Sequence, residues 1–203
     1  MKIGILGGSF DPPHAGHREV VEVAKETVDE VWIVPCGFRS DKHALSDSQM
    51  RLQMAKLAFP DCCVLDIEVS RGEMVPTYFL MKELASKHPE HQFYFILSTE
   101  LLKKLHTWKE PQRLKEEVNF LVTCRPGFEL TESEKSTFGS KGNFEFVQAQ
   151  FKVVLSSTYV RQRISEAWER TSSKSQLFDL VSNWQFLEEA VLYFVIQHKL
   201  FKL

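Results

Sequence analysis

Short apolar runs alternate with amphipathic stretches along most of this chain. Consecutive apolar residues predict buried strands, and apolar residues spaced three and four apart predict helices. The predicted strands cover residues 2–6, 31–34, 63–69, 93–97, 119–123 and 144–148. The predicted helices cover residues 17–28, 48–59, 77–88, 101–105, 157–170 and 184–198. The polar stretch 128–143 is interpreted as a surface loop.

The order of these elements favours one fold class. Alternating strands and helices are typical of a parallel sheet that is covered by helices on both faces. Residues 93–97 are a continuous apolar run, as expected of a central parallel strand. We therefore expect an α/β fold with a doubly wound, mostly parallel sheet and C-terminal helices. The 203 residues suffice for one sizeable core, so we expect a single domain over residues 1–203.

The first predicted strand runs into the stretch GILGGSFDPPHAGH, residues 4–17. In doubly wound sheets, ligands bind beyond the carboxyl ends of the strands, and glycines there allow the backbone to approach a ligand closely. The two prolines suit the segment before a helix, which we expect to begin near Ala15 or Gly16. A helix N-terminus favours an anion, and His14 and His17 share one side of its first turn. The stretch therefore predicts a phosphate site with two imidazoles aimed at it.

Other interpretations of this stretch fit less well. A Walker loop needs Lys followed by Ser or Thr after the glycines, and none follows here. A redox dinucleotide fold needs GxGxxG and an acidic residue after the second strand, which instead ends in Pro35 and Cys36. A zinc site built from the two histidines would need a third ligand. A glycine-rich turn with two incidental histidines is the structural alternative, and the complete string disfavours it.

Charge and composition narrow the function further. The formal net charge is −2 and no run of Lys or Arg exceeds two residues, so nothing indicates a nucleic-acid partner. We see no secretory signal and no apolar run of membrane-spanning length, and we expect no membrane association. The four cysteines form no CxxC pair and indicate reduced thiols in a cytoplasmic protein. The sequence leaves open whether the protein is a homo-oligomer.

The string GGSFDPPHAGH resembles the GxFDPxHxGH signature of the nucleotidylyltransferase superfamily. The whole chain is similar to its nicotinamide/nicotinate mononucleotide adenylyltransferase branch, whose (I)SSTxxR motif matches residues 156–161. Three weaker matches lie between these motifs in the expected order: residues 39–42, residues 76–78 and Trp108. The resemblance covers nearly the whole chain and implies a Rossmann-like fold.

The resemblance implies transfer of AMP from ATP to nicotinate or nicotinamide mononucleotide, which yields the dinucleotide and pyrophosphate in NAD biosynthesis. The implied catalytic residues are His14, His17 and Arg161. The implied ATP-binding residues are Gly8, Ser9, Phe10, Lys42, Glu100, Ser157 and Thr158. The implied mononucleotide-binding residues are Thr77, Tyr78 and Trp108.

Physical chemistry supports these roles. The attacking phosphate is already anionic, so the α-phosphorus needs a positioned nucleophile and stabilised charge rather than a strong base. Ser157 and Thr158 suit the first turn of a second helix, and Arg161 follows them at helical spacing. We expect Mg²⁺ to be held mainly by the ATP phosphates, with no dedicated set of metal ligands on the chain.

Several of these residues have a structural alternative. Trp108 is either a stacking platform for the pyridine ring or a core residue, and we favour the platform. Thr77 and Tyr78 either contact the mononucleotide or cap and pack a helix. Lys42 either reaches the triphosphate or is a solvated surface lysine, and Arg125 is a weak phosphate candidate. The remaining histidines are interpreted as surface or structural.

The chain departs from the family pattern after the fourth strand. The family usually has Gly-x-Asp there, with the Asp on the adenosine ribose, and this chain has Ser98, Thr99 and Glu100. The departure leaves two other readings open. One is an enzyme with another acceptor, of the phosphopantetheine or cytidylyl-transfer type. The other is a non-catalytic nucleotide-binding relative. The choice between nicotinate and nicotinamide is open as well.

Overall fold

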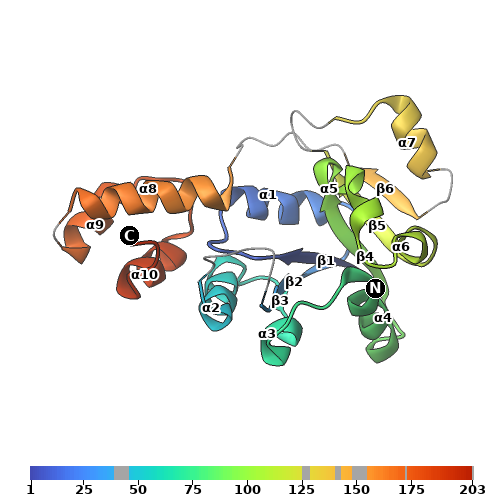
Figure 1. The fold of residues 1–203 in the computed structure, drawn as a ribbon, viewed down its shortest axis with the longest axis horizontal. Coiled ribbons are helices and arrows are strands. Elements are labelled where there is room, and N and C mark those ends of the chain that lie inside the picture. The colour runs from blue at the N-terminus through green and yellow to red at the C-terminus, as the bar shows by residue number, and fades with distance from the viewer. Residues whose placement is uncertain (39–45, 125–128, 140–142, 148–154, 172, 203) are drawn as a thin grey trace.

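The structure is a computed structural model. It describes residues 1–38, 46–124, 129–139, 143–147, 155–171 and 173–202 (Figure 1).

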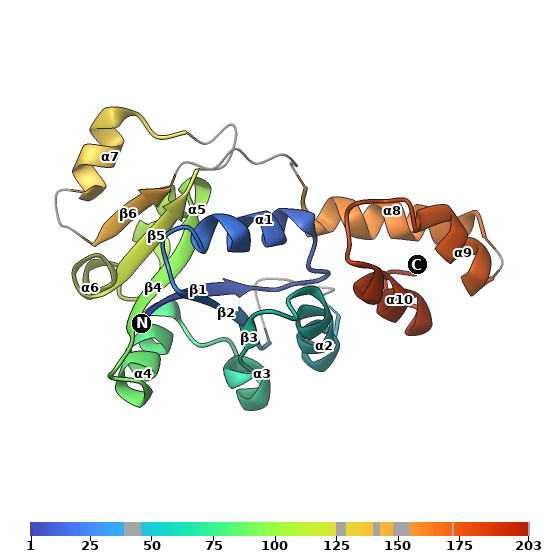
Figure 2. The same cartoon turned by 180° about the vertical axis from the view of Figure 1, so that it is seen from behind.

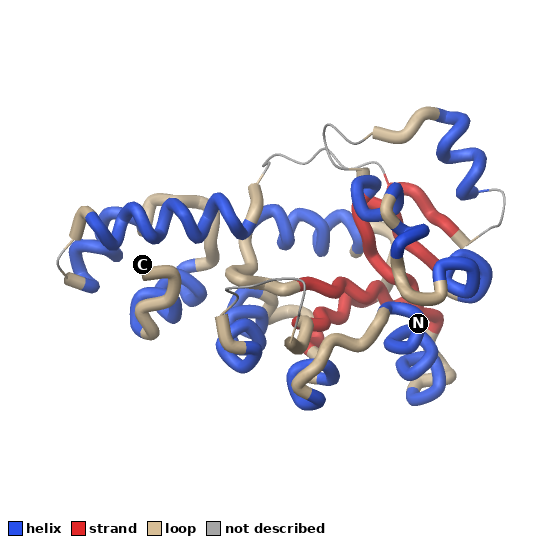
Figure 3. Tube along the Cα trace, in the orientation of Figure 1, coloured by secondary structure: helices blue, strands red, loops and turns tan. Residues whose placement is uncertain are grey.

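A six-stranded sheet forms the centre of the molecule (Figure 3). Its strands are β1 (Lys2–Gly8), β2 (Glu30–Pro35), β3 (Cys63–Val64), β4 (Gln92–Ser98), β5 (Asn119–Thr123) and β6 (Phe144–Val147). They are ordered β3-β2-β1-β4-β5-β6, and every pair is parallel. This confirms the predicted doubly wound sheet. The strand order reverses between β1 and β4, and ligands bind at such switch points, beyond the carboxyl ends of the strands.

Helices connect the strands and continue after the last one. They are α1 (Ala15–Ala24), α2 (Ser48–Ala58), α3 (Ile67–Arg71), α4 (Thr77–Lys87), α5 (Thr99–Lys103), the 3₁₀ helix η1 (Leu105–Thr107), α6 (Pro111–Glu117), α7 (Glu132–Gly139), α8 (Ser157–Glu169), α9 (Lys174–Val181) and α10 (Glu189–Gln197). Figures 1 and 2 show α8, α9 and α10 grouped at one end of the molecule, far from the start of β1.

Alternate residues of each central strand face two separate cores. In β4, Tyr94 and Ile96 join a cluster with side chains of α1, α2, α8, α9 and α10. Phe93, Phe95 and Leu97 join a second cluster with side chains of α4, α5 and α6. Since successive side chains of a strand point to opposite faces, the sheet is covered on both sides. This two-sided burial explains the continuous apolar run of β4.

The structure corrects the sequence prediction in two places. The predicted strand 63–69 is a strand of two residues followed by α3, where the Ser70 hydroxyl donates to the carboxylate of Asp66 over 2.8 Å. The predicted surface loop 128–143 contains α7. Thr131 and Glu134 form its capping box, with hydrogen bonds of 2.8 and 3.2 Å, so local polar contacts stabilise a helix start that apolar periodicity does not reveal.

Helices α6 and α9 were also not predicted, because each is short and has few buried residues. By contrast, α1 begins at Ala15 as predicted. No helix in the described part of the chain combines the length and the apolar character that crossing a membrane requires.

Candidate active site

A tightly packed turn follows the carboxyl end of β1. Phe10 has a positive φ of 49° and is only 1 % exposed. Its ring meets the rings of His17 and Phe59 edge-on, with centroids 5.2 and 5.6 Å away. A Cβ on Gly8 would lie 3.0 Å from the Phe10 ring, so any side chain at this position would press against the ring. The packed ring of Phe10 therefore fixes the shape of this turn.

The first turn of α1 fixes the ring of His17. The backbone N–H of His14 donates to Nδ1 of His17 over 3.2 Å, and the two imidazole centroids are 3.8 Å apart. A backbone N–H can only donate, so Nδ1 of His17 is an acceptor and the neutral ring carries its proton on Nε2. His17 therefore has the tautomer that can donate from Nε2 to an anion.

The start of α8 is attached to the turn that precedes α1. The Ser157 hydroxyl donates to the carbonyl of Pro12 over 3.0 Å, and Nη1 of Arg161 donates to the carbonyl of Asp11 over 2.8 Å. Nη2 of Arg161 donates to the hydroxyl of Thr158 over 3.2 Å. Two helix N-termini thus flank one turn, and both favour negative charge. The structure brings the two sequence motifs together as expected.

The carboxyl end of β4 belongs to the same edge of the sheet, because β4 pairs with β1. The Ser98 hydroxyl accepts the backbone N–H of Leu101 over 3.4 Å and caps α5. Glu100 lies in the first turn of α5, and its carboxylate accepts from the ammonium of Lys104 over 3.2 Å. Ser98, which replaces the glycine usual in the family, therefore serves as the N-cap of α5.

The candidate mononucleotide residues occupy different environments. Trp108 follows η1 and is half-buried, and its ring meets Phe95 at 88° with centroids 5.9 Å apart. Thr77 is half-buried and begins α4. Tyr78 is 2 % exposed, and its hydroxyl donates to Glu117 over 2.8 Å. The structure therefore shows Tyr78 packed against its neighbours, with its hydroxyl bonded to Glu117.

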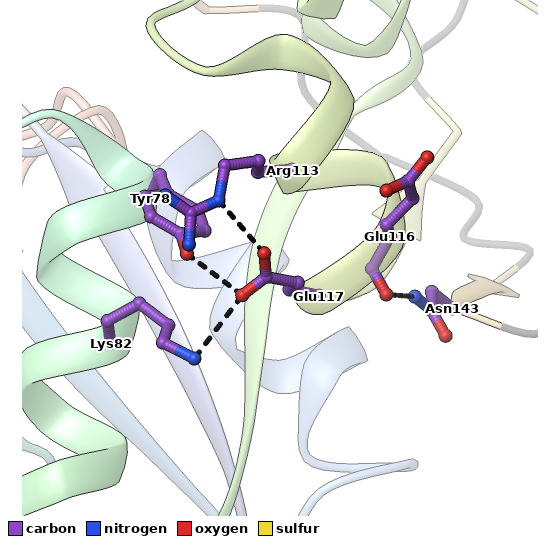
Figure 4. A network of polar contacts seen from close by, with 6 residues as sticks. All are labelled: Tyr78, Lys82, Arg113, Glu116, Glu117 and Asn143. Atoms are coloured by element: carbon purple, nitrogen blue, oxygen red, sulfur yellow. Dashed lines mark hydrogen bonds and ion pairs between the residues drawn. The ribbon is translucent and has the colours of Figure 1, made fainter.

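Glu117 joins α4 to α6 (Figure 4). Besides Tyr78, its carboxylate accepts from Arg113 over 3.0 Å and from Lys82 over 3.3 Å. The Arg113 guanidinium also lies over the Tyr78 ring, 4.4 Å from the centroid. The hydrogen bonds from Arg113 and Tyr78 lower the pKa of Glu117 to about 2. Burial and the bond to Glu117 raise the pKa of Tyr78.

Some of the predicted residues lie outside the described part of the chain. These are Lys42 with the rest of residues 39–42, His43 and Arg125. The first described residue after the gap, Ser46, donates its backbone N–H to the carboxylate of Asp11 over 3.1 Å. Ser46 therefore lies against the same turn to which the start of α8 is bonded.

Arg51 is a functional candidate that the sequence analysis missed. It is 2 % exposed and reaches backbone carbonyls at the ends of β1 and β2. A signal was present, because Arg51 shares the buried face of α2 with Met54, Ala55 and Ala58. A charged residue at a buried helical position needs polar partners, and this requirement could have been noted from the sequence.

Potential metal ligands cluster at the opposite end of the sheet. In the described residues, one group of three could hold an ion: His88, Glu90 and His91. The Glu90 carboxylate lies 3.8 Å from Nδ1 of His88 and 3.3 Å from Nε2 of His91. These residues precede β4 and so lie at its amino end. They are separate from the carboxyl ends of the strands, where the turn after β1 carries the buried carboxylate of Asp11.

Comparison with known proteins gives concordant matches. A family model described as cytidylyltransferase-like matches residues 5–163. A protein of Oceanobacillus iheyensis named "Probable nicotinate-nucleotide adenylyltransferase" is 32 % identical over 98 % of this chain and 96 % of its own length. A protein of Exiguobacterium sibiricum with the same name is 33 % identical over 81 % of this chain and 87 % of its own.

A solved structure agrees with these relatives. The Plasmodium falciparum nicotinic acid mononucleotide adenylyltransferase complexed with NaAD is similar at a TM-score of 0.78 and 25 % identity. The similarity covers 98 % of this chain and 97 % of that one.

Proposed function

This chain belongs to the cytidylyltransferase-like family, and we propose that within it the protein acts as a nicotinate-nucleotide adenylyltransferase. The family expected from the two sequence motifs is thereby confirmed. The protein is a nucleotidyltransferase. In the proposed reaction, a phosphate oxygen of the mononucleotide forms a bond to the α-phosphorus of ATP, and the bond from that phosphorus to pyrophosphate breaks.

One observation carries the proposal: the start of α8 is bonded to the same turn that leads into α1. Ser157 and Arg161 donate to the carbonyls of Pro12 and Asp11. A triphosphate at this turn would meet two helix N-termini, the His17 ring and a guanidinium. Such an arrangement stabilises the charge that grows on the leaving pyrophosphate, which is the main demand of phosphoryl transfer.

The proposed roles follow from the placement of each group. His17 donates from Nε2 to a phosphate oxygen, and His14 holds that ring in position through its backbone N–H. Gly8, Ser9 and Phe10 contribute backbone to the phosphate-binding turn. Arg161 neutralises phosphate charge.

At the other substrate subsites, Glu100 binds the adenosine ribose from the first turn of α5, and Trp108 stacks on the pyridine ring. Thr77 completes the mononucleotide site at the start of α4. We keep Lys42 as a proposed phosphate contact on the resemblance alone.

Mg²⁺ fits this site as a companion of the triphosphate. Among the described residues of the turn, Asp11 is the one carboxylate; it is fully buried, and its Oδ2 accepts from Ser46. Mg²⁺ keeps several waters and binds substrate phosphates together with few carboxylates. We therefore propose that it enters with ATP, and that it supplies charge neutralisation when bound.

The names of the relatives support nicotinate mononucleotide as the acceptor. We also propose a cytoplasmic location, which the four free cysteines support.

Pyrophosphate release tests this function. Purified protein is supplied with ATP, Mg²⁺ and one acceptor at a time: nicotinate mononucleotide, nicotinamide mononucleotide or phosphopantetheine. We expect the highest kcat/KM with nicotinate mononucleotide and formation of its adenine dinucleotide. Preference for phosphopantetheine would overturn the proposed acceptor, and no turnover with any acceptor would leave the non-catalytic alternative.

A further inference from the structure

We propose that Arg51 is a positioning residue for nucleotide binding: its buried guanidinium fixes the peptide between Ser9 and Phe10 so that the Phe10 N–H is directed to the nucleotide phosphates. This inference rests on the proposed function, because it assumes that the turn after β1 binds a triphosphate. Nothing in the sequence motifs involves Arg51, which lies in the first turn of α2.

The guanidinium of Arg51 joins the ends of two neighbouring strands. In the part of the chain that the structure describes, its hydrogen-bond acceptors are all uncharged groups. Nε donates to the Ser46 carbonyl over 3.0 Å, Nη1 to the carbonyls of Ser9 and Cys36 over 3.0 and 2.8 Å, and Nη2 to the Gly37 carbonyl over 2.9 Å. Nη1 also lies 3.2 Å from the Cys36 sulfur. A planar fork with several donors can hold these groups at once, whereas a lysine cannot.

Each of these bonds sets the direction of a neighbouring N–H. In a trans peptide, the C=O and the following N–H point to opposite sides. The Cys36–Gly37 peptide shows this, because its carbonyl accepts from Arg51 while its N–H donates to the Glu68 carboxylate over 3.1 Å. By the same geometry, the Ser9 carbonyl faces Arg51 and the Phe10 N–H faces away from it.

The Phe10 N–H has no hydrogen-bond acceptor among the described residues. It lies in the turn that precedes α1, next to the residues bonded by the start of α8. An inward-facing carbonyl with an outward-facing N–H is the arrangement that an anion-binding turn requires. The Phe10 N–H is therefore available to a phosphate oxygen.

The conformation at Phe10 needs support from both sides. A positive φ is unusual for a bulky residue and persists only where the surroundings hold it. The ring is held by contacts with His17 and Phe59, and the preceding peptide is held by Arg51. Loss of Arg51 would free the peptide to rotate while the ring stays packed.

Arg51 also places a positive charge beneath the turn. Within the described residues it forms no ion pair, and its hydrogen-bond partners there are carbonyls and a thiol. A buried charge of this kind favours an anion nearby. The charge and the fork can be separated by substitution, since Arg51→Lys keeps the charge and removes the fork.

The test compares Arg51→Lys and Arg51→Ala with Leu177→Ala. Leu177 is fully buried in α9, which carries no proposed site residue, so its truncation supplies a matched loss of stability. Binding of a non-hydrolysable ATP analogue is measured by calorimetry, and KM for each substrate by pyrophosphate release. We expect both Arg51 variants to lose about 100-fold in kcat/KM for ATP, as for a misplacement of about 1 Å, with KM for the mononucleotide unchanged.

Chemical rescue distinguishes positioning from general support. Millimolar methylguanidinium, which can enter the space left by Arg51→Ala, is expected to restore affinity for the ATP analogue. An ATP affinity of Arg51→Lys equal to that of the wild type would overturn the proposal. The proposal would also be overturned if the Arg51 variants lost kcat/KM for both substrates equally, in proportion to their fall in Tm, as Leu177→Ala does.

The binding measurement keeps this inference separate from the proposed reaction. If the wild type binds the ATP analogue but transfers nothing to nicotinate mononucleotide, the proposed acceptor fails, and the effect of Arg51 is still measured by binding. A wild type that binds no ATP analogue would overturn both.

Discussion

Two substitutions at His17 separate the two nitrogens of its ring. Nδ1 accepts the backbone N–H of His14 over 3.2 Å, and Nε2 carries the proton that we assign to phosphate binding. In His17→Asn, the side-chain oxygen can lie near the Nδ1 position, but nothing reaches the Nε2 position. In His17→Gln, the amide nitrogen can reach the Nε2 position, and the acceptor for His14 is lost.

The two variants are expected to fail in different ways. Removal of a donor to transition-state charge costs about 10²- to 10³-fold in kcat, so His17→Asn should lose at least about 10²-fold with a nearly unchanged Tm. Loss of the hydrogen bond to His14 costs about 1 kcal/mol, or about 2–4 °C in Tm for a chain of this size. His17→Gln should show that loss of stability and retain part of kcat.

Pyrophosphate release at saturating ATP and mononucleotide gives kcat, and a thermal melt gives Tm. His17→Ala is the matched control, because it removes both nitrogens and should combine the two defects. A wild-type kcat in His17→Asn, with the melt showing a folded protein, would refute the assignment of Nε2 as the phosphate donor.

Three further changes test other parts of the site. Trp108→Ala should raise KM for the mononucleotide by the equivalent of about 1–3 kcal/mol and leave KM for ATP unchanged; a parallel rise in both would make Trp108 a core residue. Glu100→Ala should weaken ATP more than 2′-deoxy-ATP or 3′-deoxy-ATP, whereas equal losses would reduce Glu100 to a helix-end residue. Because the pKa of Glu117 is lowered to about 2, its ionised carboxylate stabilises the folded protein at pH values above the ordinary carboxyl pKa. This stabilisation is lost as the pH falls toward 2. The Tm difference between wild type and Glu117→Gln should therefore shrink from about pH 5 downward, and a constant difference would contradict the network.

The sequence analysis identified the candidate site residues that belong to short local motifs. The turn from Gly8 to His17 and the start of α8 were both identified, and the structure joins them. The sheet was also predictable, because buried parallel strands such as β4 leave continuous apolar runs.

What the sequence did not reveal depends on contacts between distant residues. The helical pattern of α2 could have shown that Arg51 is buried, but no local pattern encodes the carbonyls from β1 and β2 that accept from it. The bond from Tyr78 to Glu117 spans 39 residues, and no local pattern predicts that the Tyr78 hydroxyl has a carboxylate partner on α6. The helix α7 was missed for a different reason: the prediction relied on apolar periodicity, which this polar helix lacks. Its capping box, Thr131 and Glu134, was visible in the sequence.

The bonds from α8 to the turn before α1 also order events during synthesis. They join residues 145 and 150 positions apart, so the first 17 residues leave the ribosome long before their partners exist. Contacts between residues so far apart in the sequence form slowly, because closing the loop costs entropy before the contact stabilises the chain. A nascent chain that has folded β1 and α1 therefore holds half of the proposed phosphate site, and the other half is present only after residue 161 has emerged.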